Sequence, residues 1–313
     1  MFAVTGDSKA ELAKETGPFA VEQTERLLRR LAYQAGRAAK SPHPNEVHDL
    51  RVAVRRFTQA LSAFGSCFPP KEVKRVRRRL KKIMSLAGDV RDCDIAIGML
   101  SKSQAAPGAF LTAFRKRRRD AERTLTAALK RWSERRSYTK WRRELLSEVR
   151  GGASGDLIEV TANGTLLPML REFLSRGKQA LRPKAPASKI HRLRIAAKNV
   201  RYSSELFAPV YGTALDGWLE QIRAVQTALG AINDCETVRR MVERQGGDRG
   251  IEASLRRKAR RKLEAFRQLW ADSFSDASVQ SLIGQIGRVA PKKPAARSRS
   301  IASQASHSQA AHA

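Results

Sequence analysis

The segment EVHDLRVAVRRFTQALSAF at residues 46–64 is matched by KIHRLRIAAKNVRYSSELF at residues 189–207. Aligned without a gap, the two segments carry the same or similar residues at these positions: His48/His191, Leu50/Leu193, Arg51/Arg194, Ala53/Ala196, Arg55/Lys198 and Phe64/Phe207. In the first segment the large apolar residues fall at 47, 50, 54, 57, 61 and 64. That three–four spacing forms a buried stripe on a helix, here called the apolar seam, and it predicts that each segment is a bundle helix.

A second pair of segments, GDVRDCD at 88–94 and GAINDCE at 230–236, repeats at nearly the same interval. A duplicated unit of about 140 residues is too long for a solenoid repeat and suits a helical bundle. Helical patterns dominate the chain, and alternating strand patterns are nearly absent. We therefore predict an all-α fold of two pseudo-symmetric helical bundles, internally duplicated, with about four helices each.

The apolar periodicity and the punctuation by proline and glycine predict where helices begin and end. We expect one helix to stop before Gly88 and another to start beyond it, with a similar interruption at Gly230. The other expected helices span about 18–40, 45–68, 71–87, 110–133, 138–149, 164–181, 215–229 and 251–274, besides the second repeated segment. These limits predict a flexible N-terminus at 1–17, a first bundle at 18–150, a linker at 151–156, a second bundle at 157–287 and a disordered basic tail at 290–313.

The chain of 313 residues carries a formal net charge of +31, far more than solubility requires. Such a field attracts polyanions, which leaves nucleic acid, inorganic polyphosphate and an anionic membrane surface as candidate partners. No apolar run approaches the length of a membrane span, and we expect no membrane insertion. The N-terminus has no signal-peptide core, and the three cysteines are widely spaced, so we expect a cytoplasmic protein.

The repeated helices carry a cationic stripe beside the apolar seam. It follows the same spacing shifted by one residue and consists of His48, Arg51 and Arg55 in the first copy and His191, Arg194, Lys198 and Arg201 in the second. At about 100° per residue the stripe flanks the seam, whereas a solvated charged face is expected opposite the seam and interspersed with glutamate. A line of cations about 15 Å long matches a chain of phosphates. An ordinary solvated basic face remains the alternative.

Metal-dependent chemistry has weak support in the sequence. His48-Asp49 is a dipeptide found in one class of metal-dependent phosphohydrolases, but the second copy reads His191-Arg192. A magnesium site at Asp89, Asp92 and Asp94 is a further alternative, and its second copy lacks one of the carboxylates. We therefore expect no metal, no cofactor and no catalytic residues.

Four motifs in order resemble the CHAD domain (conserved histidine α-helical domain) over about residues 18–287. They are VHDLRVAVRR, LAGDVRDCDI, IHRLRIAAKNVRY and LGAINDCETVRR. The resemblance implies two bundles around a basic cavity and binding of inorganic polyphosphate. Thr58 and Asn199 stand where the family pattern often has a basic residue, which reduces the positive charge there.

The leading hypothesis is a polyphosphate-binding protein that is not an enzyme and that associates with polyphosphate granules. A non-specific nucleic-acid binder is the alternative, and a metal-dependent polyphosphate- or triphosphate-processing enzyme is a weaker one. We expect Arg56 at the binding site because it matches the family motif, although it lies off the helical stripe and a structural ion pair is its alternative role. We add Lys81 and Arg223 because each flanks the seam of the next helix. The complete predicted binding set is His48, Arg51, Arg55, Arg56, Lys81, His191, Arg194, Lys198, Arg201 and Arg223.

Overall fold

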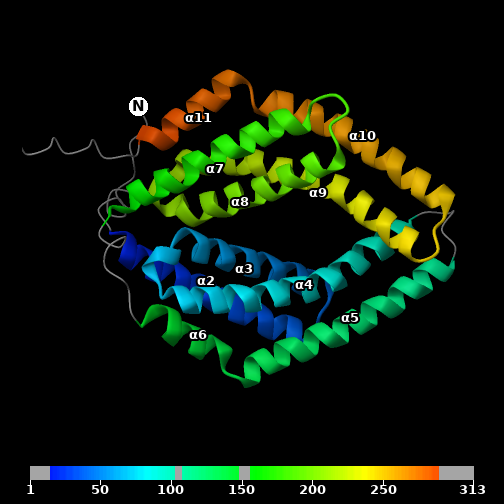
Figure 1. The fold of residues 1–313 in the computed structure, drawn as a ribbon, viewed down its shortest axis with the longest axis horizontal. Helices are drawn as coiled ribbons and strands as arrows, with labels where there is room; N and C mark the ends of the chain where they lie inside the picture. Colours follow the sequence, from blue (N-terminus) through cyan, green and yellow to red (C-terminus); the bar gives the residue numbers. More distant parts are fainter. Residues whose placement is uncertain (1–14, 103–107, 148–155, 289–313) are drawn as a thin grey trace, which may run out of the picture.

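The computed structural model describes residues 15–102, 108–147 and 156–288, and nearly all of them are helical (Figure 1). The α-helices are α2 (Thr16–Lys40), α3 (Pro44–Ala63), α4 (Pro70–Leu100), α5 (Gly108–Glu134), α6 (Ser137–Leu146), α7 (Ile158–Ala180), α8 (Ala187–Tyr211), α9 (Asp216–Arg244), α10 (Arg249–Ser273) and α11 (Asp276–Arg288). In this part of the chain the β pairing amounts to one isolated bridge, Glu15 to Leu157. The predicted all-α class is confirmed. None of the described helices is both long and apolar enough to cross a bilayer.

The helices pack in chain order within each half of the molecule. In the first half α2 packs on α3, α3 on α4 and α4 on α5; in the second half α7 packs on α8, α8 on α9 and α9 on α10. The halves meet where α3 contacts α8 and α4 contacts α9, and Figure 1 shows α3 and α8 running side by side through the middle. The pseudo-symmetry and the bundle boundaries stay predictions.

One apolar core runs through both halves. The predicted seam of the first repeated segment is buried along its whole length. At its end Phe64 packs edge-on against Phe207 of the second segment, with ring centroids 5.6 Å apart, and against Phe19 at 6.0 Å. Beside these rings a buried hydrogen bond runs from Gln59 Nε2 to Ser203 Oγ over 2.9 Å. Since α3 and α8 share this core, their relative position is fixed by close packing.

A second, smaller core joins the halves at one end. It takes Cys93 and Leu100 from α4 and Phe114 from α5, and it takes Met241 from α9 and Ile251 from α10. The halves are therefore fastened both along α3 and α8 and at the meeting point of α4, α5, α9 and α10. The walls formed by α3, α4, α8 and α9 are held in place on both sides.

The expected breaks at Gly88 and Gly230 are wrong. Gly88 lies inside α4 and Gly230 inside α9, because the packing of each long helix outweighs the cost of about 1 kcal/mol that an interior glycine carries. Helix α7 also begins earlier than expected, at Ile158, and Gly164 is an exposed residue within it. The predicted tail at 290–313, most of the linker at 151–156 and most of the N-terminal segment at 1–17 lie outside the described residues.

A close approach between α7 and α10 generates a stability prediction. A Cβ atom on Gly177 would lie 1.9 Å from Cζ2 of Trp270, whereas a Cβ on Gly164 of the same helix meets nothing within 4 Å. We expect Gly177→Ala to lower the free energy of unfolding by about 1–3 kcal/mol through overpacking, and Gly164→Ala to raise it by up to about 1 kcal/mol. Urea unfolding followed by circular dichroism measures both. Equal effects of the two substitutions would contradict the close packing of Trp270 on α7.

Candidate functional site

A cavity of about 1120 Å³ lies between α3, α4, α8 and α9. Its lining is dominated by cations: Arg51, Arg55, Lys74, Arg77, Arg78, Lys81, Arg91, Arg194, Lys198 and Arg240, with His48 and His191. The acidic residues of the lining are Asp92 and Asp234. A cavity with this composition favours an anionic ligand.

The cationic stripes face this cavity because of the register of α3 and α8. In α3 the lining residues His48, Arg51 and Arg55 recur every three or four positions beside the buried seam, and α8 supplies its own stripe in the same way. Once the seams of the two helices share one core, the neighbouring stripes meet across the cavity. Thr58 and Asn199, where the sequence lacks expected basic residues, also line it with neutral polar groups.

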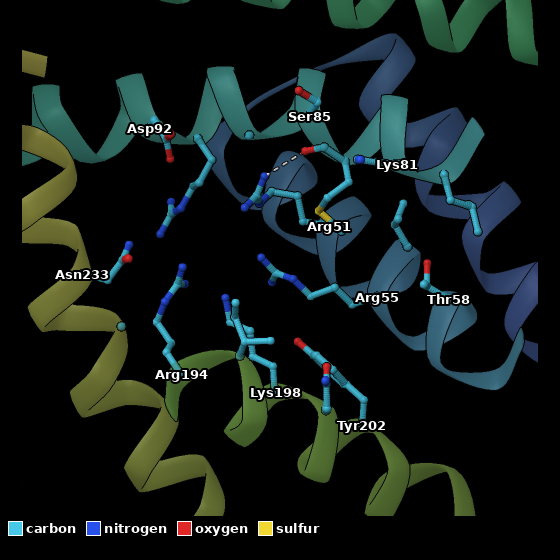
Figure 2. A pocket seen from close by; sticks show the side chains of 18 of the residues that line it. Arg51, Arg55, Thr58, Lys81, Ser85, Asp92, Arg194, Lys198, Tyr202 and Asn233 are labelled. Carbon is cyan, nitrogen blue, oxygen red and sulfur yellow. Dashed lines mark hydrogen bonds between the residues drawn. The ribbon is translucent and has the colours of Figure 1, made fainter. Parts of the chain in front are cut away.

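Four inner cations point into the space from two walls. Figure 2 shows Arg51 and Arg55 on α3 facing Arg194 and Lys198 on α8. All four are half-buried. In the part of the chain that the structure describes, none of the four has an ion-pair partner within 4.0 Å, and Arg51 Nη1 donates to the backbone oxygen of Met84 over 3.2 Å.

One donor in this group is buried without a partner. The Nε atom of Arg194 has no hydrogen-bond acceptor among the described residues, although Arg194 lines the cavity. Arg75 and Arg267, which lie outside the cavity, have unpaired buried Nε atoms as well, so this atom by itself does not mark a ligand position.

Burial and mutual repulsion weaken the charged states of the inner cations. Burial, and then the nearby Arg55 and Arg194, lower the pKa of Lys198 to about 6. Burial, and then Arg55, lower the pKa of Arg51 to about 10, and the same two causes lower the pKa of Arg194. Lys198 is therefore mostly neutral at pH 7 in the absence of an anion.

The two repeated histidines are uncharged at neutral pH. Burial, and then Arg91, lower the pKa of His48 below its ordinary value of 6.5. Burial, and then Arg194, lower the pKa of His191 in the same direction. A neutral imidazole has one N–H donor, which His48 can offer to an anion at pH 7, whereas the ring of His191 also has Asn233 as a hydrogen-bond partner. Each ring gains a charge only in more acidic solution.

The cavity extends along α4 beyond the part that is repeated in both halves. Lys74, Arg77, Arg78 and Lys81 line it at three–four spacing, and we call these four residues the α4 ramp. The predicted set contained only Lys81 of the ramp, and it also missed Arg91 on the same helix. The spacing of 74, 77, 78, 81, 85, 88, 91 and 92 indicates one continuous face of the helix, but the predicted set rested on cations that both halves retain.

The structure brings together seven predicted residues and leaves three outside. His48, Arg51, Arg55, Lys81, His191, Arg194 and Lys198 line the cavity. Arg56 and Arg201 instead donate from Nε to the two carboxylate oxygens of Glu205, over 2.9 and 2.8 Å, and Arg223 lines a separate pocket with Arg56. The charge of Glu205 holds Arg56 and Arg201 in a structural network.

The three aspartates of the first GDVRDCD segment have separate environments. Asp92 lines the cavity, Asp89 is exposed outside it, and Asp94 accepts a hydrogen bond of 2.8 Å from Nε of Arg118. Arg118 also donates to the carbonyl oxygen of Pro42 just before α3. Among the described residues, no group of three histidine, cysteine or acidic side chains is arranged to hold a metal ion.

Comparisons with known proteins agree with this fold. A protein-family model for the CHAD domain matches residues 22–243. A crystal structure of the CHAD domain from the plant Ricinus communis aligns with a TM-score of 0.64 at 18% identity, covering 88% of this chain and 93% of that one. PptA from Streptomyces chartreusis aligns with a TM-score of 0.64 at 14% identity, covering 82% of this chain and 99% of that one. The search of curated proteins found no match.

The lowered pKa of Lys198 generates a prediction on stability. Its folded pKa of about 6 lies below the unfolded value of 10.5, so between these values the unfolded state binds more protons and stability rises with pH. Lys198→Met keeps the length of the side chain and removes the buried amine. We expect the variant to be more stable than the wild type at pH 7, and to show a weaker rise of stability between pH 6.5 and 9.

Guanidinium unfolding across that pH range measures this difference. The matched control is Lys82→Met on the exposed face of α4, where we expect little change in either stability or its pH dependence. Parallel pH profiles for the wild type and Lys198→Met would show that Lys198 stays charged in the folded protein.

Proposed function

The chain belongs to the CHAD domain family, and we propose that it binds inorganic polyphosphate in the cavity between α3, α4, α8 and α9. The observation that carries the proposal is the set of unpaired, half-buried cations on facing walls. A charged group that is removed from water without a partner destabilises the folded protein. Phosphate oxygens in the cavity would supply the missing partners.

The geometry of the lining favours a chain of phosphates without bases. Non-specific binding of single-stranded nucleic acid uses aromatic side chains as stacking platforms. Besides the two histidines, the aromatic residue of the cavity lining is Tyr202, which is 6% exposed. The guanidinium of Arg201 lies 5.7 Å from the centre of its ring. By contrast, cations follow one another along the stripes and the α4 ramp. A polyanion whose only functional groups are phosphates fits that lining best.

We assign the protein a binding role without catalysis. The residues that would hold polyphosphate are the seven predicted residues of the lining, together with Arg91 and the rest of the α4 ramp. Arg56, Arg201 and Arg223 are left out of the assignment. Binding of this kind would bring the protein to polyphosphate granules in the cytoplasm. Incubating polyphosphate with the protein and Mg²⁺ or Mn²⁺ tests the enzymatic alternative, because release of phosphate would overturn the non-catalytic assignment.

Replacing the four inner cations tests the site directly. We expect Arg51→Ala/Arg55→Ala/Arg194→Ala/Lys198→Ala to weaken binding of long-chain polyphosphate at least about a hundredfold near physiological salt, since several charge-assisted hydrogen bonds are lost. The slope of log Kd against log salt concentration should fall by about 3, because fewer counterions are released. Titration at several salt concentrations measures both quantities, and circular dichroism monitors folding.

The control for this variant removes the same formal charge elsewhere. Arg115→Ala/Arg119→Ala/Arg257→Ala/Arg261→Ala changes exposed residues of α5 and α10 that do not line the cavity. We expect a small loss of affinity through the weaker long-range field. Equal losses in the two variants, or displacement of bound polyphosphate by an equal concentration of DNA phosphate, would favour the non-specific nucleic-acid binder instead.

Gly88 allows a test that removes no charge. A Cβ atom at this position would lie 3.0 Å from Nη1 of Arg51, so Gly88→Ala should displace the guanidinium that reaches into the cavity. Because alanine favours a helix interior, we expect the free energy of unfolding to rise by up to about 1 kcal/mol while polyphosphate binding weakens several-fold. Gly98→Ala, in the same helix but outside the cavity, should give the gain in stability alone. Unchanged affinity of Gly88→Ala would argue against Arg51 as a ligand.

A further inference from the structure

We infer that Asp92 and Asp234 make the cavity selective for the terminal phosphate of a linear polyphosphate chain. The inference rests on the proposed function and concerns which part of the polyanion the cavity takes. Two carboxylates in the wall of an anion site repel an ordinary anion, and their presence among so many cations calls for a physical explanation. A ligand that is anionic but still carries a proton would explain them, because its hydroxyl group can donate to a carboxylate.

The two carboxylates belong to facing walls of one region of the cavity. Asp92 comes from α4 and Asp234 from α9, and both are half-buried. They are near enough that the charge of Asp92 opposes ionisation of Asp234. Figure 2 shows Asp92 and Lys81 far apart along the same wall, α4, with the carboxylate of Asp92 directed inward and Asn233 of α9 nearer to the Asp92 end.

The charge of the lining therefore changes along the length of the cavity. At one end the cavity is lined by Lys74, Arg77 and Arg78 of the α4 ramp, and the carboxylate that α4 contributes to the lining, Asp92, lies farther along the helix. Lys74 and Asp92 are separated by about 27 Å of helix at 1.5 Å per residue. In the second half the positions that correspond to Lys74 and Arg78 are Asp216 and Glu220, so the ramp exists on one side only. A linear chain thus meets a purely cationic end and an end that holds both carboxylates.

Neither carboxylate is used up in an ion pair. In the described part of the chain, Asp92 and Asp234 have no cationic partner within 4.0 Å, although they face Arg51, Arg91 and Arg194. Burial raises the pKa of both carboxyl groups, and the arginines oppose this by favouring the ionised forms. Because neither carboxylate is engaged in a direct ion pair, its oxygens can accept a hydrogen bond from a ligand in the cavity.

Terminal and interior phosphates differ in the group that can meet such an acceptor. An interior phosphate has one strongly acidic oxygen, which is ionised near neutral pH, so it presents acceptors only. A terminal phosphate has a second ionisation with a pKa of about 6, as in a phosphate monoester, so it retains a P–OH group for part of the time. That hydroxyl donates to a carboxylate, while an interior phosphate in the same place leaves two like charges in contact. At pH 7 about one terminal group in ten carries this proton, and the carboxylates select that form, whereas the middle of a chain has no such form and is repelled.

The alternative role for Asp92 and Asp234 is purely structural, as counter-ions that keep the arginines in place. The two roles predict different results for the isosteric pair Asp92→Asn/Asp234→Asn. An asparagine offers an N–H donor to an ionised oxygen and keeps only a neutral carbonyl acceptor, so it removes the repulsion of interior phosphates and weakens the acceptor for the terminal hydroxyl. Loss of a structural counter-ion would weaken every anion alike.

A comparison of linear and cyclic ligands separates these roles. Tripolyphosphate has two terminal phosphates, whereas trimetaphosphate is a closed ring without any. We expect the wild type to prefer tripolyphosphate in calorimetric titration near pH 7, and the ratio of the two Kd values to fall about tenfold in Asp92→Asn/Asp234→Asn, chiefly through tighter binding of the ring. Asp89→Asn/Glu220→Gln makes the same change in net charge at exposed positions outside the cavity and should keep the wild-type ratio.

Three outcomes bear on the inference. An unchanged ratio in Asp92→Asn/Asp234→Asn, or equal weakening of both ligands, would overturn selection of chain ends while leaving polyphosphate binding intact. Failure of long-chain polyphosphate to bind the wild type, measured in the same series, would overturn the proposed function and this inference with it. A reduced ratio in the cavity variant together with an unchanged ratio in the control supports recognition of the terminal phosphate.

Discussion

The rest of this structure depends on a repulsive interaction that packing forces the protein to sustain. Arg51, Arg55, Arg194 and Lys198 are held in one half-buried space, and the described residues provide them with no ion pair. This repulsion would tend to separate the walls, and the counter-charges in the lining are Asp92 and Asp234, which form no direct ion pair with the four cations. The walls stay together because the same helices bury a continuous apolar core, and removing that core from the fold would cost far more than the repulsion does. The result is a cavity that is prepared for an anion before the anion arrives.

The coupling between core and cavity is a matter of helical register. Leu50 and Val54 are fully buried, and Arg51 and Arg55, one position later, face the cavity. A core residue cannot move without moving the cation next to it. The edge-on contact of Phe64 with Phe207 and the bond from Gln59 to Ser203 therefore also set the separation of the two stripes. The site is therefore as rigid as the core, and fewer side chains have to be ordered when an anion binds, which lowers the entropic cost of binding.

The sequence predicted those features that a single helix determines and missed those that depend on a neighbour. The seam and the stripe follow from periodicity alone, so the all-α class and seven lining residues were predictable. Arg201 follows the stripe, but its guanidinium donates to Glu205 one turn later on the same helix. That i,i+4 spacing is visible in the sequence, and the prediction of the cationic stripe did not take it into account. The α4 ramp was missed for the opposite reason, since Lys74 and Arg78 have acidic counterparts in the second half. Gly88 was expected to separate two helices, whereas it lies within one helix and its missing side chain leaves room for the guanidinium of Arg51.

Protons and polyanions act on this cavity as linked ligands. Burial and the neighbouring arginines lower the pKa of Lys198 to about 6, so the empty cavity carries less charge at pH 7 than its residue list suggests. An anion placed among Arg55, Arg194 and Lys198 restores the preference of the amine for its charged form, and binding then draws a proton from solution. By reciprocity, protonation of Lys198 strengthens binding. A terminal phosphate also keeps its own proton more often in acidic solution, so the interactions with Lys198 and with Asp92 both gain strength as pH falls. The charges that destabilise the empty cavity thus make its affinity for a chain end responsive to pH.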